Sequence, residues 1–471
     1  MLFNNIEFVI FLPVVVIFYY LLPGRYRWIL LLAASYFFYM SWKAEYIFLI
    51  VGSTLVDYFA GLRMERLPDC KSRRPWLLAS LFTNLGLLFT FKYFNFAAGN
   101  LNQLFDSLHL SLQLPHSDLL LPVGISFYTF QTLSYSIDVY YGKQKAERHL
   151  GYFALYVAYF PQLVAGPIER FSRLSPQLKE RHVFTYENLV NGLRLILYGL
   201  FIKMVIADNL SGFVDKIYAA PEQYGASDIL LGILFYSFQI YSDFYGYSVI
   251  AIGSALIMGV RIMDNFRTPY LAKNIAEFWQ RWHISLSTWF RDYLYLPLGG
   301  NRVSSVRWMV NILAVFVVSG FWHGANWTFL IWGGLYGIVY LIEKATGKLV
   351  PLPEQVKPFS PTHLLLAGKT FILVTLIWVF FRSQSLPDAL EMFRLAFDWG
   401  RQPADSLQIS SVTWWMMGLF LTTDIALYNT RFDEWVARRN TLIRWSIYSL
   451  IIFCVIVFAG VENFPFIYFQ F

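Results

Sequence analysis

Long apolar runs recur along the whole chain, and they constrain the fold more than any other feature. Each is about 17 residues or longer, enough for a helix to cross the hydrocarbon core of a bilayer. Of the 471 residues, 57% are hydrophobic and only 14% are charged, whereas ordinary soluble domains are about 25% charged. A soluble protein has no use for so many such runs. The sequence therefore predicts an integral membrane protein with little mass outside the lipid.

The runs predict about eleven transmembrane helices. They lie near residues 6–22, 27–43, 45–61, 76–96, 121–141, 186–207, 228–259, 306–342 (as one broken helix or two pieces), 366–382, 408–428 and 442–461.

Basic residues are unevenly distributed between the first predicted helices. They gather around Arg25, at Arg63–Arg74 and at Lys143–Arg148, whereas the connections 43–45 and 97–120 contain only one basic residue, Lys43, beside Glu45. Since basic loops stay in the cytoplasm, this alternation predicts an N-terminus on the outer side. No internal repeat or low-complexity linker is evident, so a single membrane domain over residues 1–471 is expected.

Residues 150–166 break the alternation. They are apolar, yet basic residues flank them on both sides, and two cytoplasmic loops cannot flank one complete span. The segment contains Pro161 and ends on a Gly-Pro pair, and such residues disrupt regular helix. We expect a re-entrant segment lining a cavity, because irregular backbone is tolerated at membrane depth only where protein or a wet cavity borders it. A kinked ordinary span is the alternative.

The segment 261–307 is too charged to span the membrane. Aromatic and basic residues together are typical of a membrane interface, so we expect amphipathic helices that lie on the cytoplasmic face or dip into it. The basic residues are Arg261, Arg267, Lys273, Arg281, Arg291, Arg302 and Arg307, interleaved with Trp279, Trp282, Trp289, Tyr293 and Tyr295.

Several ionisable side chains fall inside or beside the predicted helices, where burial is costly and function is the default hypothesis. Asp57 and Asp208 lie near predicted helix ends, where contact with water explains them. Asp138 and Asp243 lie deeper, and we interpret them as paired within the bundle for structure.

His323 differs from these aspartates, because it lies in an uncharged stretch that runs from Trp308 to Ile342. As one helix this stretch would be about 52 Å long, against about 30 Å for the hydrocarbon core. Two full spans would need more residues, so a broken helix is expected at Gly320, Gly324 and Asn326. A lone histidine is more often structural than catalytic. Broken helices at membrane depth mark functional sites, however, and this favours a catalytic role as much as a structural one.

The chemistry of imidazole favours a general base at this position. Its unperturbed pKa of about 6.5 suits proton transfer near neutral pH. Trp322, Trp327 and Asn326 can supply a dry wall and a hydrogen-bond partner. A metal site is less favoured, because the two cysteines, Cys70 and Cys454, form no ligand motif and no HxxxH spacing occurs. The scattered basic residues indicate loop bias rather than a nucleic-acid partner.

Six stretches carry a resemblance to a known family. They are LPVGISFYTFQTLSYSIDVY (121–140), YFPQLVAGPIERF (159–171), QIYSDFYGYS (239–248), NFRTPY (265–270), EFWQRWHISLSTWFRDYLYLPLGGNR (277–302) and GFWHGANWTFLIWGG (320–334). With these, and with the ending NFPFIYFQF at 463–471, the chain resembles the membrane-bound O-acyltransferase family over essentially its whole length. The resemblance is to the branch that acts on extracellular polysaccharides.

The resemblance implies an all-α polytopic fold: a ring of transmembrane helices around a thin centre, a funnel from each face, and re-entrant and interfacial helices. It makes His323 the histidine that promotes acyl transfer and His283 the second histidine, near the cytoplasmic side. Candidate substrate-binding residues are Asn326, Trp322, Trp279, Arg281, Ser287, Arg291 and Asp243. Tyr245, Val249 and Tyr336 depart from the pattern of relatives, which puts fine specificity in doubt.

The same resemblance implies a bacterial inner-membrane enzyme without a bound cofactor. Acetyl-CoA would donate the acetyl group from the cytoplasm, and the basic segment 261–307 would suit its phosphates, although a solvated basic face explains those charges equally well. A separate periplasmic or extracellular esterase-like protein would place the acetyl on a polysaccharide such as alginate, cellulose or peptidoglycan. D-alanyl transfer from a carrier protein to teichoic acid is the enzymatic alternative. A transporter or flippase is the non-enzymatic one, although the inverted repeats common in that class are not found.

Overall fold

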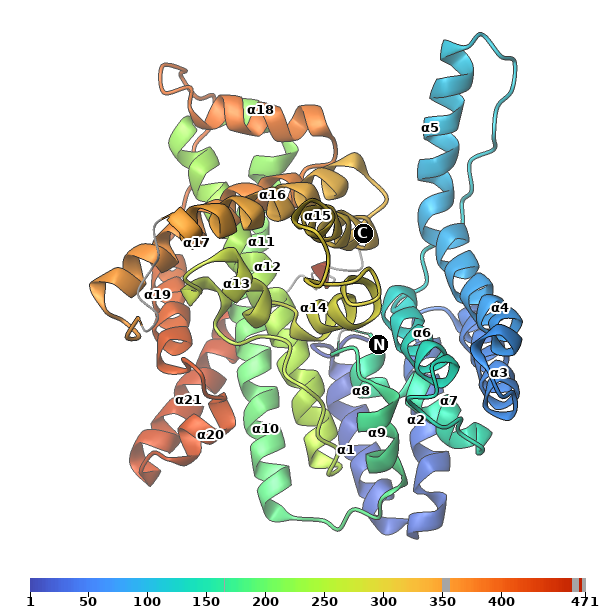
Figure 1. The fold of residues 1–471 in the computed structure, drawn as a ribbon. Coiled ribbons are helices and arrows are strands. Elements are labelled where there is room, and N and C mark those ends of the chain that lie inside the picture. The colour runs from blue at the N-terminus through green and yellow to red at the C-terminus, as the bar shows by residue number, and fades with distance from the viewer. Residues whose placement is uncertain (165, 350–355, 460–465, 468–471) are drawn as a thin grey trace. The chain divides into compact units, whose positions relative to one another are not determined.

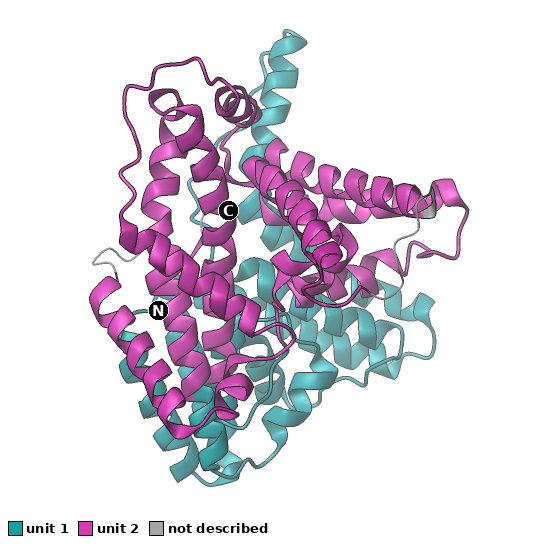
Figure 2. Ribbon diagram, turned by 90° about the vertical axis from the view of Figure 1, so that its left-hand side faces the viewer, with its two compact units in different colours: residues 1–192, 254–263 teal, residues 193–253, 264–471 magenta. Residues whose placement is uncertain are grey.

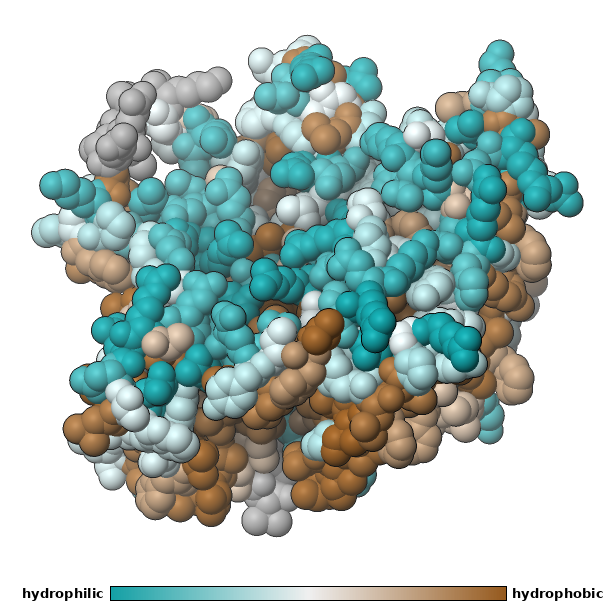
Figure 3. Space-filling view, turned by 90° about the horizontal axis from the view of Figure 1, so that it is seen from below, coloured by the Kyte–Doolittle hydropathy of each residue, from teal (hydrophilic) through white to brown (hydrophobic). Residues whose placement is uncertain are grey.

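A computed structural model describes residues 1–164, 166–349, 356–459 and 466–467, and all regular structure in these ranges is helical (Figure 1). Seven helical stretches are long and apolar enough to cross a membrane. Exposed hydrophobic side chains gather in broad areas of the surface in Figure 3, as expected of a protein that faces lipid. The all-α polytopic prediction is confirmed, whereas the count of eleven spans and the ring around two funnels stay predictions.

The chain divides into two compact units (Figure 2): residues 1–192 with 254–263, and residues 193–253 with 264–471. Whether they form one domain stays a prediction. The first unit contains α1 (Ile6–Leu21), α2 (Arg27–Met40), α3 (Ile47–Arg66), α4 (Cys70–Leu88), α5 (Phe94–Ser107), α6 (Ile125–Tyr140), α7 (Leu150–Ala158), α8 (Phe160–Leu163) and α9 (Phe171–Lys179). The helix α10 (Tyr186–Leu200) runs from the first unit into the second.

The fourth predicted span is part of a longer helical stretch, Cys70–Ser107, of 38 residues. A π-helical turn at Phe89–Tyr93 joins α4 to α5. At 1.5 Å per residue the stretch is about 57 Å long, well beyond the thickness of a hydrocarbon core. The chain returns alongside α5, where the Asn95 and Asn102 side chains each hydrogen-bond both backbone groups of one residue, Ser117 and Leu114 respectively.

The segment predicted to be re-entrant is a broken helix. The nine-residue α7 and the four-residue α8 meet at Tyr159, whose backbone is not helical (φ −50°, ψ 111°). Tyr159 and its neighbours on both sides are buried in protein. The break thus has the protein cover that irregular backbone would need at membrane depth, and no single helix runs through the described residues 150–164.

The second unit contains most of the predicted site. Its helices are α11 (Asp208–Ala219), α12 (Ala226–Ile257), α13 (Ile275–Arg281), α14 (Ile284–Phe290), α15 (Ser305–His323), α16 (Trp327–Leu349), α17 (Pro361–Arg382), α18 (Leu386–Ala396), α19 (Ser411–Ala426), α20 (Phe432–Ala437) and α21 (Thr441–Phe458).

The expected break in the uncharged stretch is confirmed. The helix α15 ends at His323, residues 324–326 are not helical, and α16 begins at Trp327 and packs back along α15. Two glycines permit this close approach. A methyl group on Gly320 would lie 2.1 Å from the Phe329 carbonyl oxygen, and one on Gly333 would lie 2.2 Å from that of Phe316. Small residues at facing positions are how membrane helices approach so closely.

The segment 261–307 forms the short helices α13 and α14 and irregular turns, and two of its aromatic residues pack into protein: Trp282 is 1% exposed and Trp289 is 7% exposed. Aromatic rings bury large areas and pack well against one another. The position of the segment at the cytoplasmic face stays a prediction.

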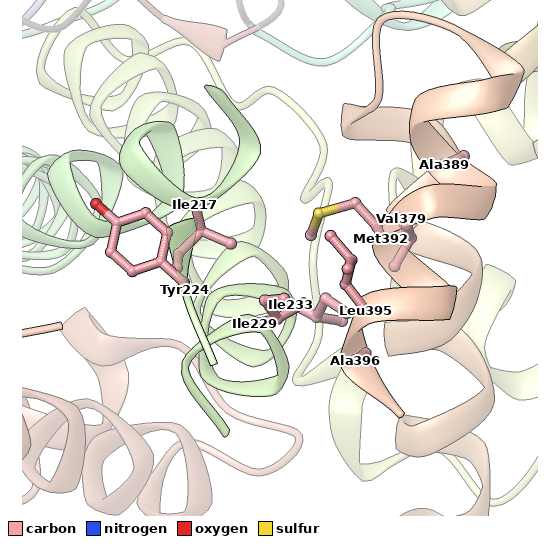
Figure 4. Packing of buried hydrophobic residues seen from close by; sticks show 9 residues of the cluster. All are labelled: Ile217, Tyr224, Ile229, Ile233, Val379, Ala389, Met392, Leu395 and Ala396. Carbon is pink, nitrogen blue, oxygen red and sulfur yellow. The ribbon is translucent and has the colours of Figure 1, made fainter. Parts of the chain in front are cut away.

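The helix α18 was not predicted, because its apolar positions occupy only one face. Ala389, Met392, Leu395 and Ala396 point from that face into a buried cluster (Figure 4). The cluster is completed by Ile217, Tyr224, Ile229, Ile233 and Val379. This packing ties α17 and α18, which follow the α15–α16 hairpin, to α11 and α12.

Candidate active site

His323 is the last residue of α15 and is 2% exposed. Three aromatic rings meet its imidazole edge to face, with ring centroids at 4.8 Å for Trp322, 5.1 Å for Trp332 and 5.3 Å for Phe381. Such edge-to-face contacts are favourable for aromatic rings. The helix break therefore places His323 among these three rings, here called the aromatic shell, rather than in lipid.

His283 joins α13 to α14 with a left-handed backbone, φ 43° and ψ 54°. This conformation is unfavourable for a residue with a Cβ, and residues held in it cluster at functional sites. The side chain is fully buried, and the Phe244 ring lies edge-on at 4.8 Å. Burial lowers the pKa of His283 to about 3, so the imidazole is neutral at physiological pH.

The structure brings the two histidines together. Their ring centroids are 6.5 Å apart, and the Trp322 ring lies next to both, at 4.8 Å from His323 and 6.1 Å from His283. Forty residues separate them in the sequence, which alone gave no sign of this proximity. A dry centre with two adjacent imidazoles is suited to moving protons, because neutral imidazole both accepts and donates one.

The other predicted site residues lie at different distances from this centre. The Trp279 ring lies next to the aromatic shell, 5.8 Å from the Trp332 ring. Ser287 donates a hydrogen bond to the Trp282 carbonyl oxygen. Asn326 donates to the Gln384 carbonyl oxygen at 2.6 Å and accepts from the Thr328 N–H, so it fixes the turn after His323.

The two predicted arginines have protein partners. Arg281 forms an ion pair with Glu277 at 2.9 Å and donates to the Tyr428 hydroxyl. Arg291 is exposed and pairs with the neighbouring Asp292. Arg281 therefore holds the α13 end in place, whereas only Arg291 presents its guanidinium to the surface.

Asp243 takes part in a buried ion-pair cluster. The Lys203 ammonium lies 2.6 Å from an oxygen of Asp243 and 2.6 Å from one of Asp208. The second Asp243 oxygen accepts from the Ile467 N–H at 2.7 Å. The sequence interpretation of Asp243 as a paired residue agrees with this geometry, and Asp138 lies half-buried at the end of α6.

The expectation that Asp57 and Asp208 are in contact with water is wrong. Asp57 is fully buried and accepts hydrogen bonds from Ser80 and Asn84, and Asp208 is 7% exposed beside Lys203. The partners of Asp57 come from the neighbouring helix α4, which a helix-end position in a sequence does not reveal, whereas Lys203 precedes Asp208 by five residues in the same helical stretch.

A cavity of about 370 Å³ adjoins the His283 segment. Arg267, Tyr245 and Val249 line it, together with the buried Ser248 and Asn265. The amide oxygen of Asn265 accepts from the Ser285 hydroxyl at 2.6 Å, two residues beyond His283. Two of the three positions that depart from the family pattern thus shape one cavity wall. The third, Tyr336, is fully buried at 5.2 Å from the Trp332 ring.

Sequence reasoning missed Lys203 and most of the aromatic shell. Lys203 was detectable as a lone cation in the apolar run 201–207, since charges inside predicted helices mark pairs or sites. Phe244, Trp332 and Phe381 carried no such signal, because aromatic residues are common throughout this chain and only the fold selects which of them surround a histidine.

An all-helical protein with several helices long enough to cross a membrane and two neighbouring buried histidines is, as a class, consistent with a membrane-embedded transferase. Comparison with known proteins identifies the class. Residues 148–382 match the sequence profile of the membrane-bound O-acyltransferase family. The chain belongs to this family, and both histidines lie within the matched region.

The similarity to individual members extends over most of the chain. The chain is 41% identical over 429 residues to the probable alginate O-acetylase AlgI of Pseudomonas syringae pv. tomato, and the alignment covers 91% of this chain and 80% of that protein. It is 37% identical over 428 residues to the peptidoglycan O-acetyltransferase of Helicobacter pylori, covering 84% and 79%. The teichoic acid D-alanyltransferase of Streptococcus thermophilus is 31% identical over 242 residues, which are 47% of this chain and 57% of that protein.

Proposed function

We propose that the protein takes an acetyl group from acetyl-CoA in the cytoplasm of a bacterial cell and passes it across the inner membrane. The acetyl then modifies hydroxyl groups of a polysaccharide outside, such as an alginate-like exopolysaccharide, cellulose or peptidoglycan, with a separate transferase as partner. The proposal rests on the buried histidine pair and on relatives that align over most of the chain and are named as an O-acetylase and an O-acetyltransferase. The N-terminus would lie on the outer side, as the basic loops indicate.

His323 is proposed as the general base. Its neutral imidazole accepts the proton from a hydroxyl group of the acetyl acceptor, while the oxygen of that hydroxyl forms a bond to the acetyl carbonyl carbon. The bond from that carbon to the donor sulfur breaks, and the proton passes on to the leaving thiolate. General base catalysis of this kind contributes about 10²–10⁴ in rate. The Trp332 indole N–H, buried and without a partner among the described residues, is a donor available beside it.

His283 is proposed to position the reacting group rather than to carry charge. With its pKa near 3 it stays neutral, so it offers one hydrogen-bond donor and one acceptor. The cavity beside it, with Arg267 at its lining, is proposed to receive part of the donor. Arginine suits the donor's phosphates, in line with the basic character of segment 261–307.

The test is His323→Ala in a strain that reports acetylation of its cell-surface polysaccharide. Loss of acetylation at normal protein level is expected. The matched control is His116→Ala, because that histidine is exposed in the connection 97–120. Intact acetylation in the His323 variant would remove the catalytic claim, and unchanged flux of a transported compound would favour a transporter instead.

The donor is tested separately, because D-alanyl transfer is the second candidate and relatives with that name align to about half of the chain. Inside-out vesicles containing the protein and its partner are incubated with labelled acetyl-CoA. Labelled protein or product is expected. No label with acetyl-CoA, but label with an acyl carrier protein, would move the proposal to a carrier-protein donor.

A further inference from the structure

A second cavity, of about 190 Å³, lies among α19, α20, α21 and the π-helical turn Phe201–Ala207, within the second unit. Its lining is apolar and includes Phe201, Leu419, Ala426, Trp435, Ile447 and Leu450. The one polar side chain in the lining is Thr423, whose hydroxyl already donates to the Phe420 carbonyl oxygen at 2.8 Å. A cavity without free polar groups selects an apolar occupant, because a polar ligand would lose its hydrogen bonds there.

The lining of this cavity reaches the exposed apolar side of α21. Leu450 lines it and is 47% exposed, and Phe453, Ile456 and Val457 continue the exposed apolar surface along the helix. Among the described residues, Thr441–Phe458 is one of seven helical stretches that are long and apolar enough to cross a membrane. The apolar molecule available at such a surface is a lipid acyl chain.

Three arginines lie close in the sequence to lining residues of this cavity. Arg438 and Arg439 follow α20 directly and are exposed, and Arg444 lies in the first turn of α21. The Arg439 guanidinium lies over the ring of Trp435, a lining residue, at 4.4 Å. Within the described residues none of these three arginines forms an ion pair. The nearby Asp433 is engaged by Arg431, and Glu434 lines the other cavity.

We propose that this cavity receives part of one acyl chain of an anionic phospholipid, whose phosphate is held by Arg439 with Arg438 and Arg444. Basic residues next to membrane helices attract anionic headgroups, and arginine matches phosphate geometry. Trp435 completes the site, since an aromatic ring at headgroup level is typical of a membrane interface. The proposal does not depend on the acetyltransferase function.

The position of this lipid gives it a structural consequence. Leu427 and Phe432 line both this cavity and the polar cavity next to His283. Phe432 also stacks on Tyr198, with ring centroids at 4.4 Å and planes within 7°. A bound acyl chain thus supports one wall of the polar cavity from behind.

The test is native mass spectrometry of the full-length protein in detergent, titrated with phosphatidylglycerol or phosphatidylcholine of the same acyl chains. Phosphatidylglycerol is expected to bind about tenfold or more tightly than phosphatidylcholine, and Arg438→Gln/Arg439→Gln is expected to remove that preference. The matched control is Lys71→Gln/Arg74→Gln, which removes the same charge from exposed positions in the first unit. Equal affinity for the two lipids, or an equal loss in the control, overturns the proposal.

A second variant tests the acyl chain without changing charge. Ala426→Phe fills the cavity and is expected to weaken phosphatidylglycerol binding about as much as the double arginine variant. Unchanged binding in a folded Ala426→Phe protein would show that the lipid does not enter the cavity, and this also overturns the proposal. Should this variant fail to fold, the arginine variants decide the question alone.

Discussion

Two regions of the second unit bury titratable groups in opposite ways. Around Lys203, one ammonium lies 2.6 Å from an oxygen of each of two carboxyl groups, and a backbone N–H donates to one of them. Around His323 and His283, aromatic rings lie with their centroids 4.8–5.3 Å from those of the imidazoles. The two imidazole centroids are 6.5 Å apart.

The difference separates structure from chemistry. A buried charge that is fully paired has no capacity left for a substrate, and removing one partner mainly destabilises the fold. A neutral imidazole in an aromatic shell costs little to bury and keeps its proton-transfer capacity. We therefore expect changes at the histidines to alter rate, and changes at Lys203 to alter stability.

The largest effect is expected from His323→Gln. With the base absent, the rate of acetyl transfer should fall by about 10²–10⁴, whereas the free energy of unfolding should fall by about 1 kcal/mol. Rate is measured with purified protein and labelled donor, and stability by thermal unfolding in detergent. A variant that keeps its rate within tenfold of the native protein would place His323 in the same structural class as Asp243.

The next effect is expected from Lys203→Met, which leaves two buried carboxylates without their cation. Loss of one partner of a buried pair costs about 3–5 kcal/mol, and thermal unfolding measures it. The triple variant Lys203→Met/Asp208→Asn/Asp243→Asn removes the charges together and should recover much of the loss. If Asp243→Asn alone lowers the rate without lowering the stability, Asp243 binds substrate after all.

The sequence predicted the histidine region better than the ion-pair cluster. Span length against membrane thickness located the break after His323, because the mismatch is a local property of residues 308–342. Asp243 reaches Lys203 from another helix, and the sequence contains no sign of that pairing, whereas Asp208 follows Lys203 by five residues in one helical stretch and could have been recognised as its partner. The same limitation hid the approach of His283 to His323.

Local patterns also failed where packing decides. The aromatic and basic residues of 261–307 have the composition of an interfacial segment, yet Trp282 is buried against Trp378 at 5.0 Å. Composition indicates which environments a residue can occupy. The neighbours that α12 and α17 provide determine which of these environments Trp282 occupies. α18 was missed for a related reason, since an amphipathic helix with one buried face lacks the long apolar run that identifies a span.

A pH titration sharpens the comparison at His283. Its pKa is about 3 in the folded protein and about 6.5 when unfolded, so below pH 6.5 only the unfolded state binds the proton. Stability is therefore complete above pH 6.5 and falls as the pH drops toward 3. The slope is about 1.4 kcal/mol per pH unit, or about 2–3 kcal/mol lost at pH 4.5. His283→Gln should flatten this part of the stability curve; a curve identical to that of the native protein would contradict the buried neutral state.

The smallest effect concerns the helix packing that holds His323 in place, and two adjacent glycines test it. Gly333→Ala puts a methyl group 2.2 Å from the Phe316 carbonyl oxygen, whereas Gly334→Ala meets only the Val317 side chain at 3.9 Å. Overpacking should cost Gly333→Ala about 1–3 kcal/mol of stability and part of the rate, because separating α15 from α16 moves His323 within its aromatic shell. Gly334→Ala should be neutral or slightly stabilising, since alanine favours helix by up to about 1 kcal/mol. Equal effects of the two substitutions would mean that the close approach of α15 and α16 does not position His323.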